Sequence, residues 1–261
     1  MRTRQDRARV DGPTRDLVYT YLGKRTGERV LAGQMTRGQG EKIHAVIWLC
    51  DLRESTPLSE AVPVEDFFRV LNEFFDCTAG AVLDHGGEIL SYIGDAVLAI
   101  FPIGGTAKPL DEACTPEEGA CKAALAAARH ARARVAALNR ARQEQGEPPL
   151  SFGLAVHVGD VIYGNIGVPE RLQFTAIGAA ANEASRLAGL CKDLDRWILI
   201  SSAFPRCFPE QMVSLGCHVL RGVGTPQEIF TLADDAATTP PGTKGARRGS
   251  ASMRRCGDSG V

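Results

Sequence analysis

The sequence predicts a mixed α/β domain in which helices pack against a sheet, and three observations lead to this prediction. Residues 43–50 form an apolar run with the length of a buried strand. Residues 63–85 place apolar side chains on one broad helical face. Residues 88–93 and 96–101 have the pattern of a hairpin around a Gly-Asp pair. This order, continued downstream, suits a ferredoxin-like βαββαβ sandwich with an added C-terminal subdomain.

A long second helix is predicted to begin at Thr115 and to end near Gln145. Thr115 caps its start, Pro116 occupies the first turn, and Glu118 reaches back, which together make a capping box. Alanine-rich sequence follows until Gly146 and a Pro-Pro pair end the helix.

The second half of the chain predicts more strands and one further helix. We expect a hairpin in Val156 to Gly167, with Gly159 and Asp160 at its turn. A helix is expected over residues 179–193. The expected strands are 151–158, 161–166, 171–177, 197–201, 212–220 and 227–232.

Composition bounds the function classes that remain open. The length of 261 residues suggests one domain with extensions, and 44% hydrophobic residues are ample for a core. A net charge of −1 gives no indication of nucleic-acid or membrane affinity. No stretch has the apolar length of a membrane span, and the N-terminus does not have the pattern of a signal peptide. The chain as given is therefore expected to be cytoplasmic.

The eight cysteines are scattered and include no CxxC pair, so the sequence indicates neither a zinc site nor a disulfide framework. Cys50, Cys77 and Cys191 lie in apolar runs and are expected to be buried thiols in a reducing compartment.

Three regions are expected along the chain. Residues 1–40 are rich in Arg, Gly and Thr and suggest a linker with a short helix or two. Residues 41–233 hold the predicted domain. Residues 234–261 are rich in Pro, Gly, Ser and Arg and are expected to form a disordered tail.

Two acidic residues end predicted strands. Asp51 follows a strongly apolar strand, and Asp95 lies in a predicted hairpin turn that can pair beside it. Two close carboxylates repel each other, and a divalent cation between them removes that penalty. Mg²⁺ prefers one or two carboxylates together with substrate phosphates. The alternative for each residue is ordinary turn chemistry, because Asp commonly follows strands and occupies turns.

Asn182 and Arg186 lie four residues apart, so they share one face of the predicted helix. Small residues around them, such as Ala179 and Ser185, allow another surface to approach closely. An arginine fork suits charge spread over phosphate oxygens. The alternative is a solvated helix face, which is the usual fate of such residues.

Three segments resemble the motifs of class III nucleotidyl cyclases, the adenylate and guanylate cyclases. IWLCDLREST is similar to their first metal-binding segment, and GGEILSYIGDAVLAIF is similar to the second. RLQFTAIGAAANEASRL resembles their transition-state helix. The resemblance covers about residues 43–233, and three motifs in the right order are more specific than any one alone.

The resemblance implies a cyclase homology domain that converts ATP to cyclic AMP and pyrophosphate with two Mg²⁺ or Mn²⁺ ions per site. It implies metal-binding positions at Asp51, Leu52 and Asp95. It assigns the ribose to Asn182 and the α-phosphate to Arg186, and it implies a head-to-tail homodimer whose site takes these two groups from different protomers. Neither nucleic acid nor membrane is implied as a partner of this chain, and an upstream sensor domain remains open.

The remaining implied positions are phosphate-binding Ser55 and Thr56 and base-reading Ser91 and Thr175. Thr175 matches the bacterial branch of adenylate cyclases that uses Thr there. Ser91 stands where active adenylate cyclases usually have a Lys that reads adenine. Glu54 stands where Gly is common in the loop that wraps the triphosphate.

These departures leave two alternatives beside an adenylate cyclase. One is a degenerate cyclase homology domain that binds nucleotide or a partner without turnover. The other is a cyclase with relaxed base preference that accepts GTP. The loss of one charge-assisted bond to the base costs roughly ten- to hundredfold in binding or rate.

Overall fold

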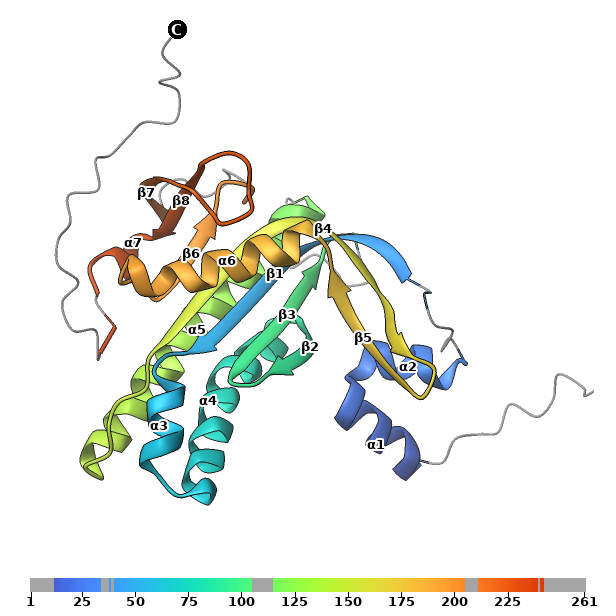
Figure 1. The fold of residues 1–261 in the computed structure, drawn as a ribbon, viewed down its shortest axis with the longest axis horizontal. Helices are drawn as coiled ribbons and strands as arrows, with labels where there is room; N and C mark the ends of the chain where they lie inside the picture. The colour runs from blue at the N-terminus through green and yellow to red at the C-terminus, as the bar shows by residue number, and fades with distance from the viewer. Residues whose placement is uncertain are drawn as a thin grey trace, which may run out of the picture.

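The computed structural model describes residues 12–33, 38, 40–104, 115–204, 211–238 and 240–241. One eight-stranded sheet organises them, in the order β2-β3-β1-β4-β6-β8-β7, with β5 paired to β4 alone (Figure 1). The strands are β1 (Gly40–Leu52), β2 (Glu88–Ile93), β3 (Ala96–Pro102), β4 (Phe152–Val168), β5 (Arg171–Ile177), β6 (Ile198–Ser201), β7 (Met212–His218) and β8 (Gln227–Leu232).

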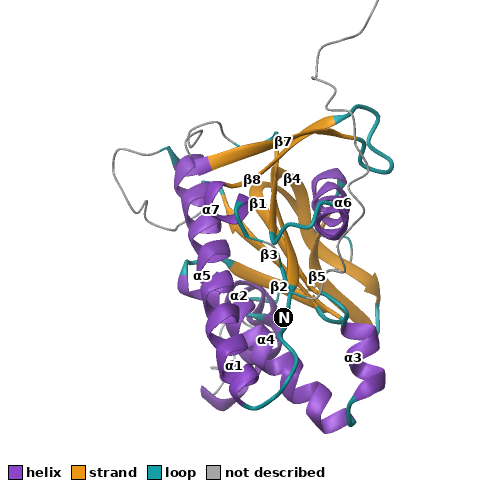
Figure 2. Cartoon of the chain, turned by 90° about the vertical axis from the view of Figure 1, so that its left-hand side faces the viewer, coloured by secondary structure: helices purple, strands orange, loops and turns teal. Residues whose placement is uncertain are grey.

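Helices cover both faces of this sheet. On one face α4 and α5 pack together, and on the other α6 lies across β4 and β1 (Figure 2). None of the helices in the described ranges is long and apolar enough to span a membrane. The helices are α1 (Gly12–Leu22), α2 (Lys24–Leu31), α3 (Ser55–Ala61), α4 (Val64–Asp84), α5 (Pro116–Glu144), α6 (Ala179–Asp193) and α7 (Ala233–Ala236).

The alternation of side chains along the central strand β1 builds two cores. Trp48 and Cys50 point into the core beneath α4 and α5, whereas Ile47 and Leu49 point into the core beneath α6. Because both faces are covered, β1 needs the continuous apolar run that its sequence contains. The α/β sandwich predicted from the sequence is confirmed.

Several local predictions are also confirmed. The Thr115 hydroxyl accepts from the Glu118 N–H at 3.2 Å, and the Glu118 carboxylate accepts from the Thr115 N–H at 2.9 Å, so the capping box is present. Gly94 has φ +64° in the turn between β2 and β3. Helix α6 has the predicted bounds.

The predicted turn at Gly159 and Asp160 is wrong. Strand β4 continues through both residues, and its hairpin partner β5 begins only at Arg171. A Cβ on Gly159 would lie 2.7 Å from the Ala180 Cβ, which real Cβ atoms do not tolerate. Glycine is therefore required here for close packing of α6 on the strand and not for a turn.

The N-terminal helices dock on the sheet through a polar network. The Thr26 hydroxyl lies 3.0 Å from the Tyr163 hydroxyl, which donates to the Glu88 carboxylate at 2.5 Å. Arg25 and Arg29 stack over the Tyr163 ring. Residues 24–31 are thereby attached to β4 and β2.

The packed domain extends past the boundary expected at residue 233. Asp235 is fully buried, and its carboxylate accepts from the Ile198 N–H at 3.1 Å and from the Thr231 hydroxyl at 3.0 Å. Arg132 forms an ion pair with Asp235 at 3.0 Å. The segment through Thr238 therefore belongs to the fold, and only residues beyond it remain candidates for the expected tail.

The structure describes the three cysteines that the sequence predicts to be buried thiols. Cys50 and Cys191 are buried free thiols, and Cys77 is a partly buried one. Cys217 is disulfide-bonded, which the sequence did not predict.

Candidate active site

The two strand-end carboxylates meet at one end of the sheet. Asp51 in β1 pairs in register with Ala96 in β3, which places it beside Asp95 in the preceding turn. The Leu52 N–H donates to the Asp95 carbonyl at 3.4 Å. Antiparallel pairing of β1 with β3 therefore brings together two residues that are far apart in the sequence.

Partial burial and the neighbouring charge of Asp95 change the titration of Asp51. Partial desolvation, the charge of Asp95 and a hydrogen bond between the two side chains together raise the pKa of Asp51 to about 6. Both groups cannot be ionised in contact without an energetic cost, which a cation between them removes.

The donor set fits a hard divalent cation. Asp51 and Asp95 supply carboxylates, and Leu52, whose side chain is buried in the core, has only its backbone carbonyl to offer. Within the described ranges no group of three or more His, Cys, Asp and Glu side chains gathers at one place. Mg²⁺ is commonly bound through one or two carboxylates together with substrate phosphates and water, which this donor set suits.

The loop after Asp51 turns sharply into α3. Glu54 has φ +58°, a left-handed conformation that favours glycine. Its carboxylate forms an ion pair with Lys192 at 3.0 Å, so the charge is neutralised by α6. Ser55 and Thr56, the predicted phosphate positions, form the first turn of α3, and Thr56 is exposed there.

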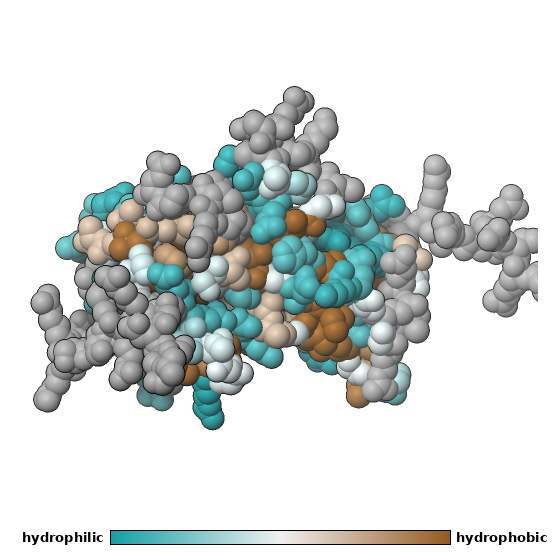
Figure 3. Space-filling model, turned by 90° about the horizontal axis from the view of Figure 1, so that it is seen from above, coloured by the Kyte–Doolittle hydropathy of each residue, from teal (hydrophilic) through white to brown (hydrophobic). Residues whose placement is uncertain are grey.

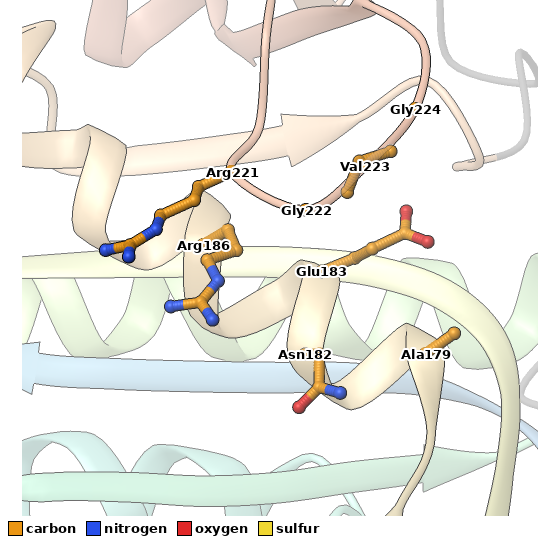
Figure 4. Close-up of a pocket in the computed structure, with 8 residues that line it drawn as sticks. All are labelled: Ala179, Asn182, Glu183, Arg186, Arg221, Gly222, Val223 and Gly224. Atoms are coloured by element: carbon orange, nitrogen blue, oxygen red, sulfur yellow. The ribbon is translucent and has the colours of Figure 1, made fainter.

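Helix α6 presents the second group of predicted residues. Ala180 and Ala184 are buried against the sheet, so Asn182 and Arg186 face outward and are exposed. The two lie along one side of a pocket of about 440 Å³ that they share with Glu183 and with residues 221–224 of the loop before β8 (Figure 4).

Arg221 is a candidate that the sequence reasoning missed. It lines the same pocket as Arg186, and the two guanidinium groups extend to the same side of it, whereas the Glu183 carboxylate points away (Figure 4). Two arginines beside a Gly-Val-Gly backbone suit an anionic ligand with several phosphates. The available signal was an arginine followed by a glycine-rich loop.

A partly buried network fixes the Glu183 carboxylate away from the two arginines. Gln227 donates to the Glu183 carboxylate at 2.9 Å, and His157 Nε2 lies 3.9 Å from it. His157 Nδ1 is 2.8 Å from the Ser201 hydroxyl. Burial lowers the pKa of His157. The network joins β4, β6 and β8 to the first turns of α6.

The two predicted base-reading residues lie on strands that contact each other, β2 and β5. Thr175 is buried with 8% exposed. The Ser91 hydroxyl is buried and has no hydrogen-bond partner among the described residues. An unsatisfied buried hydroxyl of this kind costs free energy.

Within one chain, the carboxylate pair and the α6 pair are not brought together. Gly153 is paired with Asp51, and a Cβ on Gly153 would lie 2.8 Å from the Cys191 Cβ, so the last turn of α6 is level with Asp51. Asn182 lies nine residues before Cys191, about 14 Å along the helix axis. The two halves of the predicted site are therefore separated in one copy.

Comparison with curated proteins finds nucleotide cyclases. An adenylate cyclase of Anabaena cylindrica is 35% identical over 164 residues, which are 61% of this chain and 30% of the relative. Adenylate cyclase 1 of Rhizobium meliloti (strain 1021) is 34% identical over 188 residues, which are 70% of this chain and 26% of the relative. The chain thus spans less than a third of the length of either relative.

Solved structures give the same answer for the fold. A bacterial light-regulated adenylyl cyclase matches with a TM-score of 0.70 and 23% identity, over 85% of this chain and 61% of that chain. The guanylyl cyclase Cya2 matches with a TM-score of 0.60 and 25% identity, over 74% of this chain and 93% of that chain. No protein-family model matches the sequence. The chain belongs to the class III adenylate/guanylate cyclases, of which it contains the cyclase homology domain.

Proposed function

We propose that this chain converts ATP to 3′,5′-cyclic AMP and pyrophosphate at a site shared by two copies of the chain. The observation that carries the proposal is the contact of Asp51 with Asp95 at one sheet end, with Asn182 and Arg186 in a pocket away from them. The similarity to two adenylate cyclases supports the choice of reaction.

The chemistry assigns each side chain a task. The ribose 3′-oxygen attacks the α-phosphate in line, so one P–O bond forms and the bond to pyrophosphate breaks. Asn182 orients the ribose, and the Arg186 fork stabilises charge that develops on the α-phosphate oxygens. Arg221 adds a second guanidinium for the phosphates.

Asp51, Asp95 and the Leu52 carbonyl are the groups that would hold Mg²⁺ or Mn²⁺. When bound, the two ions lower the pKa of the ribose hydroxyl and neutralise phosphate charge. Ser55 and Thr56, in the first turn of α3, follow the loop that would wrap the triphosphate. The ion pair of Glu54 with Lys192 limits the repulsion that a carboxylate in this loop would otherwise exert.

Exposed apolar residues on β4 and β5 support a homodimer. Apolar side chains reach the molecular surface in patches among polar ones (Figure 3). Two adjacent strands contribute four such residues, which are Ile162, Ile166, Val168 and Ile177. A second copy that covers this surface would bury apolar area and bring each carboxylate pair toward the other chain's α6.

A second candidate function is nucleotide binding without turnover, and Ser91 favours it. A serine hydroxyl cannot supply the ammonium that reads adenine in active adenylate cyclases, and Thr175 also carries only a hydroxyl. The same pair favours a cyclase that accepts GTP as well, because a hydroxyl can both donate and accept a hydrogen bond.

Purified chain incubated with ATP or GTP, with Mg²⁺ or Mn²⁺, separates these candidates. Cyclic AMP formed faster from ATP than cyclic GMP is formed from GTP supports the proposal. Similar rates with both nucleotides support relaxed base preference. Binding without product, with Asp51→Ala as the blank, supports the non-catalytic alternative.

A further inference from the structure

The C-terminal end of α6 is closed by a Schellman motif. The Arg196 N–H donates to the Cys191 carbonyl at 3.0 Å, and the Asp195 N–H donates to the Lys192 carbonyl at 3.3 Å. Asp195 has φ +53°, the left-handed conformation that glycine usually supplies in this motif. A non-glycine residue is strained there, so the surrounding contacts must hold this end.

Arg53 supplies those contacts from another part of the chain. Its Nη2 atom donates to the Cys191 carbonyl at 2.7 Å and to the Arg196 carbonyl at 2.5 Å. Its Nη1 atom lies 4.0 Å from the Asp195 carboxylate. A cation at a helix C-terminus also meets the negative end of the helix dipole.

This arginine is deeply buried for a charged residue. Its side chain is 7% exposed, and desolvation lowers the pKa of its guanidinium. A buried guanidinium costs free energy unless its surroundings compensate it. Such a residue has few alternative positions, so it fixes the distance between the segments that it joins.

The segments that it joins belong to different halves of the proposed site. Arg53 is two residues after Asp51, in the loop that joins β1 to α3 and that we call the Asp51 loop, and Cys191 is in the last turn of the helix that carries Arg186. The exposed ion pair of Glu54 with Lys192, at 3.0 Å, links the same loop to the same turn. Contacts from the adjacent residues Arg53 and Glu54 therefore attach the Asp51 loop to α6.

We propose that Arg53 is a positioning residue that connects the two active sites of the dimer by locking the Asp51 loop to α6 within each chain. The proposal rests on the shared-site function. In that dimer one chain gives its Asp51 to one site and its Arg186 to the other, so a shift in either segment is passed to the other site. Catalytic groups must be held to within about 0.5 Å, which makes such a connection consequential.

Mixed dimers test whether Arg53 positions α6, which carries Arg186. One chain carries Arg186→Ala and its partner carries Asp51→Ala, which leaves a single complete site. Arg53→Gln is then added to the Asp51→Ala chain, which contributes only the residues of its α6 to the complete site. We expect kcat at the remaining site to fall tenfold or more, because α6 of that chain loses its anchor. An unchanged kcat would overturn the proposal.

Arg142→Gln in the same chain is the matched control. Arg142 is also a buried arginine, with a side chain 4% exposed, but it pairs with Glu73 and Glu147 on the opposite face of the sheet. It should lower the melting temperature and leave kcat unchanged. An equal loss of kcat in both variants would reduce Arg53 to a general stabilising residue and would overturn the positioning role. If Arg53→Gln does not fold, Arg53→Lys is used instead. It keeps the charge, but its single nitrogen cannot reproduce the contacts of both Nη1 and Nη2, and the same outcomes apply to it.

A measurement that does not need activity keeps this inference separate from the proposed function. Hydrogen exchange of the Asp195 and Arg196 amides should accelerate tenfold or more in Arg53→Gln, whereas amides in α4 keep their protection. Unchanged exchange at these two amides would contradict the lock even in an inactive protein. Absence of cyclase activity in the wild-type chain with accelerated exchange in the variant would instead contradict the proposed function alone.

Discussion

Asp51 lies beside Asp95 at one end of the sheet, and partial desolvation together with the charge of Asp95 raises the pKa of Asp51 to about 6. An acid whose pKa is raised by folding binds its proton more tightly in the folded state. The folded state therefore loses stability as the pH rises from about 4 through about 6, since Asp51 ionises beside Asp95.

Asp51→Asn should remove this loss. At about pH 8 without metal, the variant should unfold at a higher temperature than the wild type. The gain in free energy of unfolding should be roughly 1 kcal/mol or less, because the site is partly exposed. Thermal denaturation from about pH 4 to 8 measures it. Asp160→Asn is the control, because hydrogen bonds from Lys42 and His44 lower the pKa of Asp160 and its loss should not stabilise.

Metal addition should change the melting temperatures of the wild type and of Asp51→Asn by different amounts. Mn²⁺ should raise the melting temperature of the wild type at about pH 8, because an ion that binds only the folded state stabilises it. Asp51→Asn should show little of this increase. Equal stabilisation of both proteins would place the metal elsewhere.

Ser91→Lys should raise ATP turnover by roughly tenfold, the scale of one charge-assisted hydrogen bond. The preference for ATP over GTP should rise as well, because guanine presents a donor where adenine presents an acceptor. Initial rates with both nucleotides measure this, and Ser91→Ala controls for loss of the hydroxyl. If the lysine variant keeps the wild-type rates and preference, position 91 does not face the base.

Arg221→Ala should weaken nucleotide binding roughly ten- to hundredfold, the cost of one charged hydrogen bond to phosphate. We place the Arg221 contact on the distal phosphates, which AMP lacks, so the loss should be larger for ATP than for AMP. Calorimetric titration with a non-hydrolysable ATP analogue measures it. Arg140→Ala, an exposed arginine on α5, should bind normally. Equal losses for ATP and AMP would argue against a distal-phosphate contact.

Truncation after Ala233 should destabilise the domain, whereas truncation after Pro241 should not. The shorter protein loses the buried Asp235 carboxylate, which accepts from Ile198 and Thr231 and pairs with Arg132. Removing one partner of a buried pair costs about 3–5 kcal/mol. Chemical denaturation of both truncated proteins measures this, and equal stability would show that α7 contributes nothing.

The sequence was informative where a residue's local pattern decides its structure. The capping box at Thr115 and the hairpin at Gly94 are formed by near neighbours, so their patterns predicted them. The apolar run before Asp51 likewise predicted a buried strand because both faces of the sheet are covered.

It was misleading where long-range packing decides. Gly159 has the appearance of a turn residue, but the glycine is required by the approach of Ala180 from α6. Asp235 lies in the segment that was expected to be a disordered tail, yet it is buried because Ile198 and Arg132 converge on it from distant elements. Arg221 joins the pocket only because its loop folds back onto α6.

The central claim is that each site takes its carboxylates from one chain and Asn182 and Arg186 from another. Mixing Asp51→Ala with Arg186→Ala tests it most directly. Each variant alone should be inactive, and the mixture should recover up to about a quarter of the wild-type activity, because half of the dimers are mixed and each holds one complete site. If subunits exchange and the mixture remains as inactive as either variant alone, the shared-site account is contradicted.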